Sequence, residues 1–138
     1  MRRLIARRAL VLIAVLTTAA CETSDPFEVP TGPTPVPVTE TFAGTLTPNG
    51  AHIHPFQTQT GGTITATLTV VSPETVVGLA LGTWNGSACQ VTIDQPAALQ
   101  GAILLGTASA IGNYCARVYD AAGTLPAPTM YELQVLRP

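Results

Sequence analysis

The chain has 138 residues, of which 46% are hydrophobic and only 10% are charged; all six of its basic residues are Arg, eight residues are acidic, and the formal net charge is −2. Four of the six arginines lie within the first eight residues, so a chain cleaved after that segment would carry eight acidic residues and two arginines. This balance excludes a nucleic-acid-binding protein, because neutralising phosphates requires clustered Lys or Arg.

The first 20 residues have the pattern of a secretory signal peptide. Residues 1–8 are basic, residues 9–16 are apolar, and small residues lead up to Cys21. The apolar run is shorter than the ~20 residues that span a membrane; an uncleaved membrane anchor is the alternative interpretation.

Cys21 follows Ala19 and Ala20 directly, which resembles the lipobox of bacterial lipoproteins. In that family the cysteine is lipidated and becomes the first mature residue. The next residue is Glu22 and not Asp, which in this family's sorting pattern points away from retention in the inner membrane. The resemblance implies an exported protein held in the bacterial cell envelope, at the outer membrane, by the lipid on Cys21.

Residues 21–38 continue from this cysteine as a tether rich in Pro and Thr. The stretch has five prolines and three acidic residues with almost no apolar periodicity, so it is expected to be a disordered, extended linker. At ~3.1 Å per residue it would reach roughly 50 Å. We therefore expect three parts: a signal peptide (1–20), a tether (21–38) and one domain (39–138).

Residues 39–138 alternate apolar and polar side chains, and turn residues recur at short intervals. The clearest case is residues 62–71, where Ile64, Ala66, Leu68 and Val70 alternate with threonines. Turns are expected at residues 83–86 and 94–96, among others, and no segment shows helical periodicity. We predict strands over residues 39–46, 52–58, 62–71, 77–81, 88–93, 98–105, 114–119 and 130–136. About eight short strands at this spacing predict an all-β fold, a two-sheet antiparallel β-sandwich.

Most of residues 51–136 resembles the bacterial pre-peptidase C-terminal domain. The resemblance lies in a strand with an aromatic residue, a glycine-led Thr-rich strand, an aliphatic strand, a glycine-x-tyrosine strand and a final strand. These segments are residues 54–56, 61–68, 77–81, 112–119 and 131–135. The resemblance implies a jelly-roll-like sandwich that accompanies secreted or surface proteins and is not itself a catalyst.

Cys89 and Cys115 suit one disulfide in an exported protein. Their strands disagree in parity, because Cys89 alternates with the apolar Val91 and Ile93, whereas Cys115 alternates with Arg117. A bridge therefore requires a β-bulge or a strand covered on both faces. Two buried thiols are the alternative interpretation.

His52 and His54 are weak candidates for metal ligands. Two residues apart on a strand, their rings face the same way and would supply half of a zinc or copper site. A third ligand, Glu40 or Glu132, would have to arrive through the fold. The alternative places His54 at the margin of the core beside Phe56, and we predict no metal and no cofactor.

No catalytic residues emerge from the sequence. No serine lies in a Gly-x-Ser-x-Gly elbow, and no cysteine has a context that lowers a thiol pKa. We therefore predict that the protein is not an enzyme.

Trp84, at a turn, and Tyr119, on an outer strand face, are candidate ligand contacts. The alternative is that Trp84 closes the end of the sandwich and Tyr119 packs beside Arg117. Two functions follow: a lipid-anchored envelope protein whose sandwich is a structural or protein-interaction module, or a surface glycan-binding module that uses these aromatics. The expected partners are the membrane, through the lipid, and an envelope protein or glycan.

Overall fold

The computed structural model describes residue 32 and residues 34–138. The predicted signal peptide, Cys21 and most of the predicted tether lie outside the described residues. Eight strands are present: β1 (Val38–Leu46), β2 (Ala51–Thr58), β3 (Gly62–Ser72), β4 (Val77–Trp84), β5 (Cys89–Ala98), β6 (Ile103–Ala108), β7 (Gly112–Tyr119) and β8 (Thr129–Arg137). This part of the chain contains no helix long and apolar enough to span a membrane.

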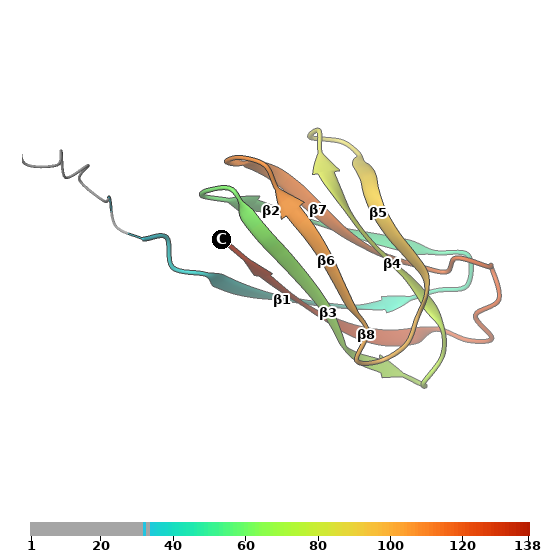
Figure 1. The fold of residues 1–138 in the computed structure, drawn as a ribbon. Helices are drawn as coiled ribbons and strands as arrows, with labels where there is room; N and C mark the ends of the chain where they lie inside the picture. Colours follow the sequence, from blue (N-terminus) through green and yellow to red (C-terminus); the bar gives the residue numbers. More distant parts are fainter. Residues whose placement is uncertain (1–31, 33) are drawn as a thin grey trace, which may run out of the picture. The chain divides into compact units, whose positions relative to one another are not determined.

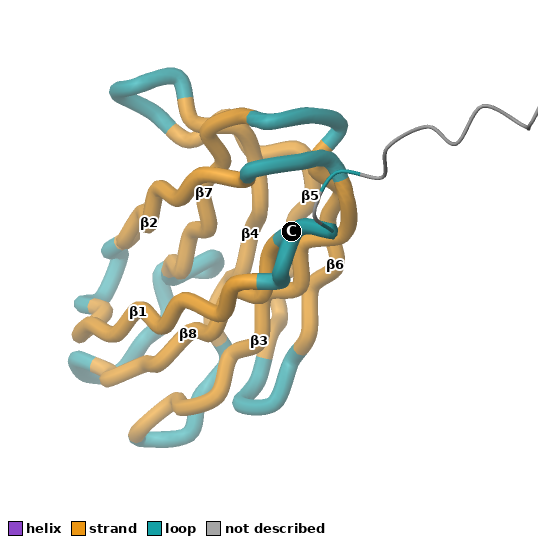
Figure 2. Tube along the Cα trace, turned by 90° about the vertical axis from the view of Figure 1, so that its left-hand side faces the viewer, coloured by secondary structure: helices purple, strands orange, loops and turns teal. Residues whose placement is uncertain are grey.

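The strands form two four-stranded antiparallel sheets that pack face to face, as Figures 1 and 2 show. The first sheet has the order β1-β8-β3-β6, and the second has the order β2-β7-β4-β5. The edge strands β1 and β2 contact each other on one open side of the sandwich, and β5 and β6 do so on the other. The predicted all-β, two-sheet sandwich is therefore confirmed.

The core lies between the sheets and is built by alternate residues of the inner strands. Leu68 on β3, Leu79 on β4, Val118 on β7 and Leu133 on β8 are fully buried. Burying one such side chain stabilises the fold by about 1.5–3 kcal/mol. Alternation therefore decides which face of each strand is turned inward.

The expected alternation of β3 fails at its end. Ile64, Ala66 and Leu68 are buried as predicted, but Val70 is 38% exposed and Val71 is buried instead. The pairing of β3 with β8 shifts between Leu68 and Val70. This β-bulge adds one residue to β3, so every side chain after it changes face.

The expected turn at residues 94–96 and the expected strand at 98–105 are also wrong. β5 runs through Asp94 and Pro96 to Ala98, and the next strand begins only at Ile103. Proline is tolerated here because β5 is an edge strand, where one side of the backbone needs no ladder partner. The turn expected at 83–86 is shorter than predicted, because Trp84 still belongs to β4.

Cys89 and Cys115 form the predicted disulfide, with their Cα atoms 5.8 Å apart. The bridge joins β5 to β7 across the outer face of β4, and the β4–β5 pairing shifts between Leu81 and Gly82. Gly82 permits this crossing, since a Cβ atom there would collide with the main chain of Gln90. A bulge in the β4–β5 pairing thus reconciles the opposite parities of the two cysteines.

Candidate functional site

Two imidazoles and one phenol meet at the open side of the sandwich next to β1 and β2. Tyr131, on β8, is only 2% exposed, whereas His52 and His54, on β2, are half-buried. The Tyr131 hydroxyl lies 2.9 Å from Nδ1 of His52 and 2.7 Å from Nε2 of His54. It can donate its one proton to one ring nitrogen and accept an N–H from the other. We call these three residues the His-Tyr cluster.

Strand β1, which lies beside β8 in the first sheet, also shapes the cluster. The ring of Phe42 stacks on that of His54, with 4.7 Å between centroids and 19° between planes. At Gly44 a Cβ atom would lie 2.7 Å from the Tyr131 hydroxyl oxygen and 2.8 Å from Nδ1 of His52. Only glycine therefore leaves room for both polar atoms to meet here.

Burial sets the charge of the cluster. It raises the pKa of Tyr131 to about 12. The pKa of His54 is lowered, first by burial and then by the nearby ring of His52. The phenol and the His54 ring are therefore both neutral at neutral pH.

The carboxylates considered as third ligands lie elsewhere. Glu40 pairs with Arg137 at 3.3 Å. Glu132 accepts a hydrogen bond from the Thr69 hydroxyl at 2.9 Å, on the face of β8 opposite to Tyr131. Within residues 34–138, no three His, Cys, Asp or Glu side chains come together as a metal site. The third group beside the two histidines is instead Tyr131, which the sequence analysis did not consider.

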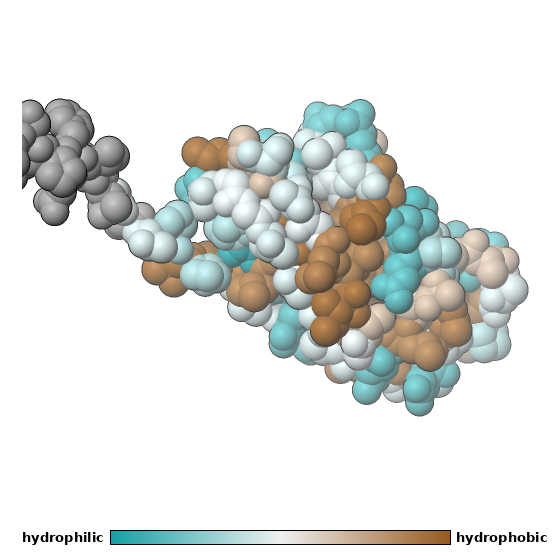
Figure 3. All heavy atoms as spheres, viewed as in Figure 1, coloured by the Kyte–Doolittle hydropathy of each residue, from teal (hydrophilic) through white to brown (hydrophobic). Residues whose placement is uncertain are grey.

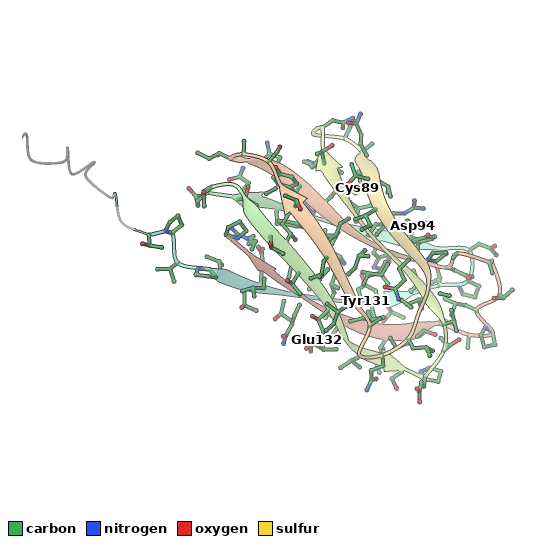
Figure 4. The ribbon with its side chains drawn as sticks, viewed as in Figure 1. Cys89, Asp94, Tyr131 and Glu132 are labelled. Atoms are coloured by element: carbon green, nitrogen blue, oxygen red, sulfur yellow. A yellow bond between two sulfur atoms is a disulfide. The ribbon has the colours of Figure 1, made fainter. Side chains whose placement is uncertain are left out.

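Tyr119 lies on the outer face of the second sheet, in contact with Gly78 of β4. Its hydroxyl donates to the carboxylate of Asp94 on β5, with distances of 2.6 and 2.7 Å to the two oxygens. The guanidinium of Arg117 lies over the ring, 4.5 Å from its centroid. Burial, followed by the hydrogen bond and charge of Asp94, raises the pKa of Tyr119 to about 12. Figure 4 labels Asp94, together with Cys89 on the same strand and Tyr131 and Glu132 on β8.

Trp84 is half-buried on the same outer face as Tyr119. Because Leu79 and Leu81 point into the core, Gly78 and Trp84 both point outward. Trp84 is six residues further along β4 than Gly78, which is the pairing partner of Tyr119; at ~3.3 Å per residue, this separates the two aromatics by about 20 Å. The structure thus places them on one surface but does not bring them together.

Aliphatic side chains gather on the opposite open side of the sandwich. Those of β5, β6 and the segment between them are 38–58% exposed: Ile93, Leu99, Ile103 and Leu105. Ile103 and Leu105 pair with Thr67 and Thr65, so they project from the outer side of the first sheet at its β6 edge. Figure 3 shows a continuous hydrophobic area on this face, where β6 runs. We call these four residues the β5–β6 surface.

Two hollows accompany these features. One, of about 260 Å³, opens between the sheets near β5 and β6 and is lined mainly by small and hydroxyl-bearing residues, among them Thr83, Thr92 and Thr107. The other, of about 430 Å³, is shallow and includes Val70, Met130 and Glu132 in its lining. Tyr131 of the His-Tyr cluster also lines the second hollow.

Comparison with known proteins gives one informative likeness. No protein-family model matches the chain, and no curated protein matches it in sequence. Among solved structures, the crystal structure of the Yersinia pseudotuberculosis-derived mitogen is similar, with a TM-score of 0.56 and 14% identity. The match covers 75% of this chain and 88% of that one. At this identity it shows a shared β-sandwich fold and nothing about activity.

Proposed function

We propose that this chain is a lipid-anchored protein of the bacterial cell envelope whose non-catalytic β-sandwich binds another envelope protein through the β5–β6 surface. The lipid on Cys21 provides the anchor, and the tether holds the sandwich away from the membrane. Partner binding needs no cofactor, and the domain acts as a protein-interaction module of the kind that its resemblance to the pre-peptidase C-terminal domain implies.

The observation that carries this proposal is the exposure of the β5–β6 surface. Soluble proteins seldom leave large aliphatic side chains in one contiguous exposed patch unless the patch binds something. Ile103 and Leu105 are 58% and 57% exposed, and they project from an edge strand. An edge strand also has unpaired N–H and C=O groups, which an extended segment of a partner can join by strand addition.

Site-specific photo-crosslinking tests the proposed contact. A crosslinking residue at Ile103 or Leu105, in the native envelope, is expected to give a discrete adduct with a partner protein. Thr41 is the matched control, since it is exposed on the outer side of β1, at the opposite edge of the same sheet. Adducts of equal yield at Thr41 and Ile103, or none at either, would refute the assignment of this surface.

Fractionation tests the anchor separately. The unmodified chain is expected in the membrane fraction, and Cys21→Ala is expected in the soluble fraction, because a thioether-linked lipid supplies the binding energy, at ~0.8 kcal/mol per buried CH₂. Retention of Cys21→Ala in the membrane would refute lipid anchoring and leave the β5–β6 assignment untouched.

The second candidate function, glycan binding, rests on the shared surface of Trp84 and Tyr119. Against it, a sugar stacking on Tyr119 would have to displace the Arg117 guanidinium that already lies over the ring. A pull-down on envelope polysaccharide compares the chain with Trp84→Ala. Specific retention that Trp84→Ala abolishes would favour this alternative, and equal retention would remove it.

A further inference from the structure

The His-Tyr cluster has the composition of a metal site whose third donor is a phenol. Nδ1 of His52 and Nε2 of His54 both approach the same oxygen, and both rings are partly accessible to solvent. Imidazole nitrogen is a common ligand for transition metals, and a phenolate oxygen, like a carboxylate, carries a negative charge. Nothing in the proposed partner-binding role requires these three groups to converge.

If the donors keep this spacing around an ion, the donor–metal–donor angles to Tyr131 are narrower than tetrahedral. At metal–donor distances of about 2.0–2.1 Å, atoms that lie 2.7–2.9 Å apart subtend about 80–95° at the ion. Tetrahedral zinc requires ~109° and therefore donors about 3.3–3.4 Å apart. Angles near 90° are those of tetragonal N,O coordination, which Cu²⁺ favours, and Cu²⁺ is also the strongest binder of the divalent first-row series.

We propose that His52, His54 and Tyr131 form a copper(II)-binding site at the open side of the sandwich between β1 and β2. The two histidines contribute neutral ring nitrogens and Tyr131 contributes a phenolate. This inference is independent of the partner-binding role, since the β5–β6 surface lies on the other open side.

The proton balance of binding follows from the hydrogen bonds. Cu²⁺ takes the place of the hydrogen-bonding protons, so the Tyr131 hydroxyl gives up one proton to solvent when the oxygen–metal bond forms. The ring that accepts the Tyr131 proton already carries its N–H on the nitrogen that faces away. The ring that donates to Tyr131 moves its proton to its other nitrogen, which changes its tautomer without changing its charge. The site then carries one net positive charge, and its affinity rises with pH because one proton is released.

The residues around the cluster support its orientation. Phe42 holds the His54 ring by stacking, and Gly44 leaves the space in which Tyr131 and His52 approach each other. Ligands that are held before the metal arrives need little reorganisation on binding.

Copper titration of the full chain, purified in detergent and stripped with a chelator, tests the proposal. Calorimetry is expected to show one Cu²⁺ per chain. The copper-loaded chain is expected to show a phenolate-to-copper charge-transfer band in the visible spectrum and nitrogen splitting in its electron paramagnetic resonance spectrum. Both spectra are read on the unmutated chain, so the test does not depend on a variant folding.

Variants then identify the ligands. Tyr131→Phe keeps the ring and removes the oxygen, so the band is expected to vanish and affinity to fall by at least about 10-fold, the lower end of the loss seen even for outer-shell changes. Tyr119→Phe is the matched control, because it removes a different hydroxyl whose pKa is also raised to about 12, and it is expected to bind copper unchanged. His52→Ala and His54→Ala are each expected to lose one nitrogen from the splitting pattern.

Three outcomes would overturn the proposal: no saturable copper binding, copper binding without the charge-transfer band, or equal loss of affinity in Tyr131→Phe and Tyr119→Phe. Zn²⁺ provides a further comparison. Tighter binding of Zn²⁺ than of Cu²⁺ would contradict the tetragonal geometry.

Discussion

Gly82→Ala, made with and without the disulfide, tests whether the Cys89–Cys115 bridge keeps β5 packed closely against β4. A Cβ atom at residue 82 would collide with the main chain of Gln90, which is adjacent to Cys89 and so is held in place by the bridge to Cys115. In the oxidised protein the start of β5 has little freedom to move away. In a Cys89→Ala/Cys115→Ala chain the start of β5 is free to lift from β4.

The expected magnitudes follow from the geometry. The disulfide closes a loop of 26 residues, and its loss is expected to cost about 3.5 kcal/mol in the chain-entropy model. Overpacking by one methyl group against a main chain that does not yield costs about 1–3 kcal/mol. We therefore expect Gly82→Ala to cost ~2 kcal/mol with the bridge and less than ~1 kcal/mol without it, a coupling energy of at least ~1 kcal/mol.

Urea unfolding of the four chains of this double-mutant cycle measures the coupling. For a domain of this size, ~1 kcal/mol corresponds to a shift of the midpoint by roughly 0.5–1 M. Gly112→Ala is the matched control, because a Cβ atom there makes only ordinary contacts, at 3.5 Å or more. Equal costs of Gly82→Ala in both backgrounds would refute the idea that the disulfide presses β5 onto β4.

Three further predictions concern the tyrosines and the His-Tyr cluster. With a chelator present, the free energy of unfolding should decrease as pH falls from about 6.5 toward the lowered pKa of His54, because the unfolded chain takes up a proton that the folded chain does not. Urea midpoints measured across this pH range check the prediction, and His54→Gln should reduce their dependence on pH. In alkali, stability should be lost as pH rises from about 10 to about 12, because Tyr131 and Tyr119 ionise at higher pH in the folded chain than in the unfolded chain. An ultraviolet titration of Tyr131→Phe should show one fewer tyrosine that ionises at this high pH, and an unchanged titration would contradict the prediction. Gly44→Ala should destabilise by ~1–3 kcal/mol through its clash with Tyr131 and His52, and thermal unfolding that matches the parent chain would show that β1 yields.

Alternation of apolar and polar residues predicts the sandwich, because this pattern repeats every two residues in a half-buried strand. β3 follows the pattern from Ile64 to Leu68. The rule fails where the ladder itself is irregular. Val70 changes face after a bulge that depends on how β3 pairs with β8, and no property of residues 68–70 alone requires it. Pro96 suggested a turn, yet it lies within β5, because its position on a sheet edge removes the cost of its missing N–H.

For the candidate site too, one part can be predicted from the sequence and another part cannot. The spacing of His52 and His54 correctly predicts two side chains on one face, since this depends only on the pleat of one strand. Their meeting with Tyr131 depends on contacts 77 and 79 residues away in the chain, between strands of different sheets. Such a meeting follows from the packing of the two sheets, which alternation within a strand does not encode. A buried Tyr with no assigned hydrogen-bond partner was the available signal, because a buried hydroxyl needs one.

The two open sides of the sandwich are chemically different, and the first strand lies at only one of them. The described domain begins its sheets with β1 at Val38, so the chain enters at the edge next to β2 and the His-Tyr cluster. In the first sheet, β8 and β3 separate β1 from β6. β1 therefore lies at the edge of the first sheet opposite to the one that carries Ile103 and Leu105. A partner on the β5–β6 surface and a metal in the His-Tyr cluster would then occupy opposite sides of one rigid core, and binding of either should leave the affinity for the other unchanged.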